Sequence, residues 1–182
     1  MANYRIIALD LDGTLTRSDK TISPHTRDVL IQAQQRGAKV VLASGRPLNG
    51  MSFLADELKM DLYGGTILAF NGGEIVDWST KEVLNRVVLS DEALPQLYDF
   101  AREKGFAIMT YCGEQIFTES ADNKYIMQSA FRNRMEVRIV DSFLQSARDW
   151  GHLPKCLVVG DPERLEVFEN PLHALAVGES CF

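Results

Sequence analysis

The chain has 182 residues, of which 46% are hydrophobic and 24% charged, and its formal net charge is −6. This composition is sufficient for one sizeable hydrophobic core or two small ones, and it excludes a largely disordered chain. The negative net charge argues against general binding to nucleic acid or to an anionic membrane surface, although a local cluster of donors can still bind a small anion.

Cysteines and histidines are few and scattered. Cys112, Cys156 and Cys181 include no C-x-x-C pair. A disulfide framework or a zinc site is therefore not expected, and reduced thiols in a cytoplasmic protein are the simpler interpretation. The apolar stretch after Met1 is too short for a signal sequence or a membrane span. The remaining candidates for metal ligation are expected to be structural or surface residues: His25, His152 and His173.

Residues 5–70 alternate between strand and helix patterns. The apolar run from Ile6 to Leu9 predicts a buried strand, and Ser23-Pro24 predicts a helix start with Ser23 as the N-cap. The predicted elements, in order, are a strand at 5–11, a helix at 23–37, a strand at 39–43, a helix at 47–58 and a strand at 66–70. Short connections between such elements are typical of a parallel sheet with right-handed crossovers.

Polar side chains follow each of these three strands where the strand ends. They are Asp10 and Asp12 after the first strand, Ser44 and Arg46 after the second, and Asn71 after the third. In an open α/β sheet the carboxyl ends of the strands form the edge where ligands bind. We therefore expect a ligand site at this edge.

The pattern changes after Asn71 to an α+β section. It predicts strands at 74–78 and 83–89, a helix at 90–104, a hairpin at 106–118, a helix at 123–132 and strands at 136–140 and 155–159. We expect two domains, with residues 1–82 forming the N-terminal part of an α/β core and residues 83–182 a separate α+β module.

Asp10-Leu11-Asp12-Gly13-Thr14 is the most specific chemical signal in the chain. Two carboxylates two residues apart can take distinct roles, and Gly13 permits a tight turn whose N–H groups point at an oxyanion. An ordinary Asp-Gly turn would explain Asp12 and Gly13. It does not explain Asp10, because an acid directly after four apolar strand residues is costly to bury without a partner.

D-L-D-G-T after an apolar strand resembles the first motif of the haloacid dehalogenase superfamily. Ser44-Gly45-Arg46-Pro47 resembles the second motif, a Ser or Thr that ends the next parallel strand. With Asn71-Gly72-Gly73 and an α+β insert after the third strand, the chain is similar to the Cof-type sugar-phosphatase branch. The resemblance extends from about residue 4 to about residue 165 and implies a Rossmann-like parallel-sheet core with an α+β cap.

The resemblance assigns a role to each acid. Asp10 would be the nucleophile that takes the phosphoryl group, and Asp12 would protonate the leaving alkoxide and later activate water. Mg²⁺ would bind the Asp10 carboxylate and the Asp12 backbone carbonyl. Ser44 would donate a hydrogen bond to a phosphoryl oxygen.

The same resemblance adds Thr14, Gly45, Arg46 and Asn71 to the substrate-binding set. Alternatives remain for Ser44, Gly45, Arg46 and Asn71. The Ser44-Gly45-Arg46 segment could be only a loop before a helix, and Arg46 could form an ion pair instead of holding a substrate oxygen. Asn71-Gly72 is also a strong hairpin signal.

The superfamily has two later motifs, a Lys and a strand that ends in acids. Gly160-Asp161 after the strand at 155–159 is the only candidate for the acids, but Asp161-Pro162 is also typical of a helix N-cap. We expect Asp161 and Lys155 to be structural. Residues 170–182 supply no further strands, so we expect a truncated core with an exposed hydrophobic edge and a weakened metal site.

The sequence thus predicts an α/β fold with a truncated, haloacid dehalogenase-like parallel-sheet core and an incomplete cap at 83–182. The expected function is a Mg²⁺-dependent phosphatase that acts on small phosphorylated metabolites such as sugar phosphates through an aspartyl-phosphate. A phosphomutase and a non-catalytic phosphate-binding or interaction module are the two alternatives. No nucleic acid or membrane partner is expected, and the oligomeric state stays open.

Overall fold

The computed structural model describes residues 5–168 and divides the chain into two compact units, Met1–Val87 and Val88–Phe182. The division falls after the boundary predicted between residues 82 and 83, because β5 (Val83–Arg86) pairs with β4 (Glu74–Asp77) of the first unit. The predictions for His173, Cys181 and the tail at 170–182 lie outside the described residues.

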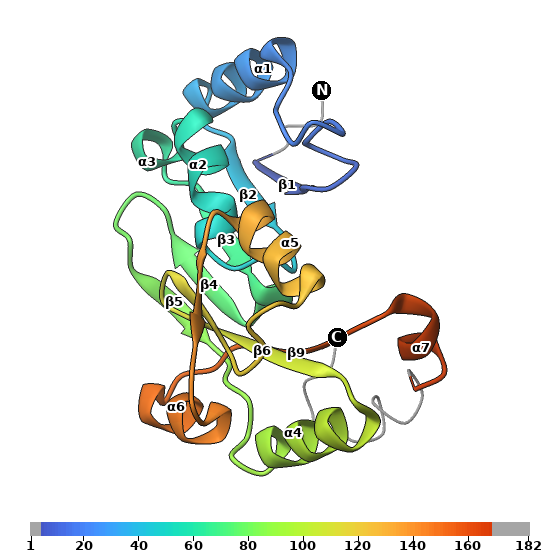
Figure 1. Ribbon diagram of the computed structural model, residues 1–182. Helices are drawn as coiled ribbons and strands as arrows, with labels where there is room; N and C mark the ends of the chain where they lie inside the picture. Colours follow the sequence, from blue (N-terminus) through green and yellow to red (C-terminus); the bar gives the residue numbers. More distant parts are fainter. Residues whose placement is uncertain (1–4, 169–182) are drawn as a thin grey trace. The chain divides into compact units, whose positions relative to one another are not determined.

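The first unit contains a five-stranded sheet in the order β1-β2-β3-β4-β5 (Figure 1). Its parallel half consists of β1 (Ile6–Asp10), β2 (Lys39–Ala43) and β3 (Thr66–Ala69). β3 and β4 are antiparallel, as are β4 and β5. The predicted parallel arrangement of the first three strands is confirmed.

Local sequence signals account for the helices between these strands. In α1 (Pro24–Gln35), the Ser23 side chain accepts a hydrogen bond from the Thr26 amide and Pro24 occupies the first turn, as predicted. α2 (Asn49–Glu57) begins two positions after Pro47 and is followed by a short helix, α3 (Met60–Tyr63), that the sequence pattern did not predict.

The turn between β3 and β4 confirms the hairpin alternative for Asn71-Gly72. Residues Phe70–Gly72 form a single 3₁₀ turn (η1). Phe70 and Asn71 have φ values of 55° and 60°, in the left-handed region that costs a non-glycine residue about 1–2 kcal/mol. Two consecutive residues of this kind mark a turn that the surrounding contacts hold in place.

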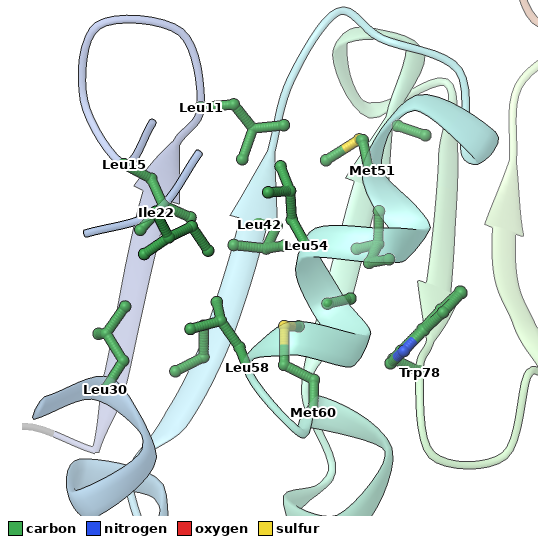
Figure 2. Close-up of a cluster of buried hydrophobic side chains, with 14 residues drawn as sticks. Leu11, Leu15, Ile22, Leu30, Leu42, Met51, Leu54, Leu58, Met60 and Trp78 are labelled. Carbon is green, nitrogen blue, oxygen red and sulfur yellow. The ribbon is translucent and has the colours of Figure 1, made fainter. Parts of the chain in front are cut away.

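One face of the sheet is covered by α1, α2 and α3 (Figure 2). Leu42 of β2 and Ile67 of β3 are fully buried there, and the helices contribute Leu30, Leu54 and Met60 to the same cluster. On the opposite face of the sheet, the described residues leave β1 uncovered, and Ile6 on that face is 64% exposed. The prediction of a buried strand was therefore wrong for β1, whose residues alternate between exposed and half-buried.

The second unit contains a four-stranded sheet in the order β8-β7-β6-β9. The strands are β6 (Ala107–Cys112), β7 (Gln115–Thr118), β8 (Glu136–Ile139) and β9 (Cys156–Val159). The helices are α4 (Ala93–Lys104), α5 (Lys124–Asn133), α6 (Phe143–Trp150) and α7 (Pro162–Glu166). The strands match the predicted ones within two residues at each end, whereas α6 was not predicted.

The helices of this unit lie on both faces of its sheet. α4 and α6 share a core cluster with Cys112 and Phe117, whereas Tyr111 on the alternate face shares a hydrogen bond with Ser129 of α5, 3.2 Å between the two hydroxyl oxygens. Burial raises the pKa of Cys112 and of Cys156 to about 12, so both thiols stay protonated at neutral pH. Within residues 5–168, no helix is both long and apolar enough to cross a bilayer.

Candidate active site

The carboxyl ends of β1, β2 and β3 bring the predicted residues of the first unit together. Asp10 pairs in register with Ala43, so Ser44 continues β2 beside the end of β1. The Ser44 amide donates to the Leu68 carbonyl at 3.0 Å, and the Asn71 amide donates to the Ser44 carbonyl at 3.0 Å. Asp10, Ser44 and Asn71 therefore lie at one edge of the sheet, as the topology of parallel strands predicts.

Asp10 is exposed at the end of β1. Its carboxylate accepts no hydrogen bond from any residue between 5 and 168, whereas its backbone carbonyl accepts one from the Leu15 amide at 3.1 Å. The argument that Asp10 must be a buried acid was wrong, because the open side of β1 exposes it. An unpaired carboxylate in this position can contact a substrate or bind a cation.

The loop after Asp10 is a tight turn anchored in the core. Gly13 has a φ of 85° and open space around it, and Thr14 next to it is exposed. The Thr16 hydroxyl donates to the Leu11 carbonyl at 2.8 Å, and Leu15 packs into the hydrophobic cluster (Figure 2). The glycine is required here because its φ lies in a region that side chains disfavour.

Asp12 is held by the guanidinium group of Arg46. The Arg46 Nε donates to Asp12 Oδ2 at 3.0 Å and its Nη2 donates to Oδ1 at 2.7 Å, which is the two-pronged geometry of a strong Arg–carboxylate pair. The remaining Nη1 donates to the Gly50 carbonyl at 3.2 Å, and the Arg46 side chain is only 6% exposed. Of the two roles considered for Arg46, the structure shows the ion pair.

Lys20 makes a second cationic contact with Asp12, 2.7 Å from its Nζ to Oδ1. The hydrogen bonds from Arg46 lower the pKa of Asp12 to about 2, burial opposes them, and Lys20 adds to the lowering. Asp12 is therefore a carboxylate at neutral pH in the substrate-free chain. That form suits a base that activates water, whereas protonation for the acid role would have to overcome these contacts.

Ser44 and Gly45 connect β2 to the loop that positions Arg46. The Ser44 hydroxyl oxygen accepts a hydrogen bond from the Arg46 amide at 3.3 Å, which leaves the hydroxyl proton able to donate to a ligand. The Phe70 amide donates to the Arg46 carbonyl at 2.9 Å, so the loops after β2 and β3 support each other.

Two oxygens in this region fit the Mg²⁺ ion that the resemblance implies. They are the Asp10 carboxylate and the Asp12 backbone carbonyl, which likewise accepts no hydrogen bond from the described residues. Mg²⁺ commonly binds one or two protein oxygens and keeps several waters. Across residues 5–168, no group of three His, Cys, Asp or Glu side chains could hold a metal.

In the second unit, Asp161 has the structural role that was predicted. It is the N-cap of α7, and its Oδ1 accepts a hydrogen bond from the Glu163 amide at 3.1 Å. Lys155 directly precedes β9, and its backbone carbonyl accepts a hydrogen bond from the Thr110 hydroxyl at 2.7 Å.

Sequence reasoning missed Lys20 and Gly50. Lys20 lies in a short polar segment that contains no motif, and Gly50 contributes only a backbone carbonyl. A possible signal for Lys20 is its position in the loop that directly follows the two acids. Its contact with Asp12 depends on how that loop closes, which no local pattern specifies.

Comparison with known proteins places this site in a family context. A crystal structure of a haloacid dehalogenase-like hydrolase from Bacteroides thetaiotaomicron superposes with a TM-score of 0.86 and 45% identity, covering 93% of this chain and 63% of that one. YxeH of Bacillus subtilis, which is named as a phosphatase, is 28% identical over 169 residues, 89% of this chain and 60% of its own length. The chain therefore spans less than two thirds of either relative.

A third similarity is more local. The 5-amino-6-(5-phospho-D-ribitylamino)uracil phosphatase YcsE of Bacillus subtilis is 32% identical over 97 residues, which cover 53% of this chain and 37% of YcsE. The resemblance to the haloacid dehalogenase superfamily is confirmed. Because residues 7–180 match the model of the haloacid dehalogenase-like hydrolases, the chain belongs to that family.

Proposed function

We propose that this chain carries the catalytic residues of a Mg²⁺-dependent phosphatase that hydrolyses small phosphorylated metabolites, with Asp10 as its nucleophile. The observation that supports this most directly is the unpaired, exposed Asp10 carboxylate at the strand edge, beside an Asp12 that two cations hold. Only Asp10 of the two acids is free to attack a phosphorus atom.

In the proposed reaction, an Asp10 oxygen attacks the phosphorus and the ester P–O bond breaks, which leaves an aspartyl-phosphate and an alkoxide. The alkoxide takes a proton from the protonated form of Asp12. Water then attacks the phosphorus, Asp12 takes its proton, and the acyl P–O bond breaks to release inorganic phosphate and restore Asp10. Ser44 and Thr14 are proposed to donate hydrogen bonds to phosphoryl oxygens.

Mg²⁺ held by the Asp10 carboxylate and the Asp12 carbonyl would offset the repulsion between an anionic nucleophile and an anionic phosphate. The hydroxyls of Ser44 and Thr14 would then fix the orientation of the phosphoryl group, and Arg46 would keep Asp12 beside it. Gly45 and Asn71 lie at the same edge of the sheet and are proposed to support the bound phosphoryl group through their backbone.

The relatives support a phosphate ester as the substrate. YxeH is named as a phosphatase, and YcsE is named for a phosphorylated ribitylamino-uracil. The second unit, Val88–Phe182, is proposed to act as the cap that selects among such esters.

The test is hydrolysis of p-nitrophenyl phosphate and a panel of phosphorylated sugars by the full chain with Mg²⁺. Asp10→Asn should reduce the rate by at least about 10³-fold, since it removes the nucleophile. Asp28→Asn is the matched control, because Asp28 is an exposed acid of α1 whose partner among residues 5–168 is its neighbour Arg27. Equal activity of wild type and Asp10→Asn would refute the role of Asp10.

A second measurement locates the intermediate. Acid quenching during turnover, borohydride reduction of the acyl phosphate and peptide mass spectrometry should place the modification on Asp10. Release of inorganic phosphate from a sugar phosphate would distinguish hydrolysis from the mutase alternative, since a mutase retains the group.

A further inference from the structure

Lys20 is a second cation in contact with Asp12, in addition to Arg46. Arg46 already contacts both oxygens of Asp12 and is fixed by Gly50 and by burial. Lys20 adds its ammonium to Oδ1, an oxygen that already has a donor. An additional exposed ion pair of this kind contributes little to stability, so stability alone does not account for it.

The Lys20 side chain is more exposed than the Arg46 side chain and has fewer hydrogen bonds. Lys20 is 45% exposed and Arg46 is 6% exposed. Within residues 5–168, the Lys20 ammonium contacts Asp12 alone and uses one of its three donors. A lysine on a flexible four-carbon stem can therefore turn to another anion while Arg46 keeps Asp12 in place.

Contacts within the loop and with the core fix the backbone at Lys20, while its side chain stays exposed. Lys20 has a φ of 66°, a backbone conformation that is unfavourable for any residue other than glycine. The Thr21 hydroxyl, which directly follows Lys20 in sequence, accepts a hydrogen bond from the Arg17 guanidinium at 2.8 Å and donates one to the Asp19 carboxylate at 2.7 Å. Leu15 and Ile22 fasten the two ends of the loop in the core (Figure 2).

The residues near Lys20 indicate which anion its ammonium would bind. Asp10 lies two residues before Asp12, and its free carboxylate is the proposed nucleophile. We propose that Lys20 is a phosphate-binding residue: its ammonium rests on Asp12 in the substrate-free chain and turns to a phosphoryl oxygen when a phosphate group binds at the end of β1. This inference rests on the proposed function and adds a residue to its binding set.

Binding of inorganic phosphate to the full chain tests the inference. Lys20→Met should weaken the Kd for phosphate by about tenfold or more, because a charge-assisted hydrogen bond is lost. Lys20→Arg should stay within about threefold of wild type, since it keeps the charge. Lys59→Met is the matched control, because Lys59 is also an exposed lysine with a positive φ, 55°, and should leave the Kd unchanged.

A direct readout separates ligand binding from a merely structural role. The side-chain NMR signal of Lys20, assigned by its disappearance in Lys20→Arg, should shift on phosphate addition, whereas the Lys59 signal should not. An unchanged Kd in Lys20→Met, an unmoved Lys20 signal, or the absence of phosphate binding by the wild-type chain would each overturn the inference.

The outcomes also separate this inference from the proposed function. A chain that binds phosphate through Lys20 but hydrolyses no ester contradicts only the phosphatase. A chain whose hydrolysis depends on Asp10 but whose KM and kcat are both unaffected by Lys20→Met contradicts only the role of Lys20. If the inference holds, Lys20→Met should raise KM more than it lowers kcat.

Discussion

Arg46 and Asp12 meet through two hydrogen bonds although 34 positions of sequence separate them. The pair joins the loop after β2 to the loop after β1, and the Gly50 carbonyl anchors the far side of the guanidinium at the start of α2. A buried cation thus fixes an acid that lies two residues after the proposed nucleophile.

Replacing Arg46 should destabilise the chain. Arg46→Met leaves the Gly50 carbonyl without its donor and removes two charge-assisted hydrogen bonds from Asp12, so we expect a loss of about 1–3 kcal/mol in the free energy of unfolding. Urea denaturation at pH 7 measures it. Arg27→Met is the control, since Arg27 pairs with its exposed neighbour Asp28 and should change stability by less than about 1 kcal/mol. Equal losses in the two variants would contradict this prediction.

Stability should depend on Asp12 at acid pH. Because the folded pKa, about 2, lies below the ordinary value of 3.8, the ionised Asp12 stabilises the fold above pH 3.8, and this contribution disappears as the pH falls toward 2. Its size should be well under the full linkage value of about 1.4 kcal/mol per pKa unit, since the side chain is 39% exposed and screened by solvent.

Thermal unfolding between pH 2 and pH 5 checks this dependence. Asp19 and Asp77 also have lowered pKa values, through hydrogen bonds from Thr21 and from Ser79, and they add to the acid dependence of stability. The difference between wild type and Asp12→Asn isolates Asp12, and a difference that stays constant across this range would refute the assignment.

Mg²⁺ should stabilise the chain through Asp10 more than through the Asp12 side chain. Asp10 offers a carboxylate and Asp12 a backbone carbonyl, which survives substitution of the side chain. We expect Mg²⁺ to raise the Tm of wild type and Asp12→Asn, and to have little effect on Asp10→Asn or after chelation. An equal loss of the Mg²⁺ effect in both variants would show that the Asp12 carboxylate is itself a ligand.

Gly65 should tolerate no side chain. A Cβ at this position would lie 2.5 Å from the Met60 Cε and 2.8 Å from the Met60 Cβ, inside the core that Figure 2 shows. Gly65→Ala should therefore cost about 1–3 kcal/mol, as overpacking does. Denaturant unfolding measures it, and an unchanged midpoint would mean that Met60 can move aside.

Local sequence patterns predicted most of the elements of both units, because caps and apolar periodicity act over a few residues. Ser23-Pro24 began α1 and Asp161-Pro162 began α7 where the pattern indicated. α3 and α6 were missed. α3 is a single turn between the left-handed residues Lys59 and Gly64. α6 has a Ser142 N-cap and apolar residues at helical spacing, Phe143, Leu144, Ala147 and Trp150, so its signal was present in the sequence and was overlooked.

The sequence by itself predicted the members of the candidate site, because Asp10 ends β1 and the other three residues, Asp12, Ser44 and Asn71, lie within two positions of strand ends. The parallel pairing of these strands places their ends at one edge. Only the tertiary structure decided which acid is free. Asp10 is unpaired because one side of β1 is open, and Asp12 is held because Arg46 and Lys20 reach it across 34 and eight positions. Such contacts depend on how loops close in space, which neither periodicity nor a motif encodes.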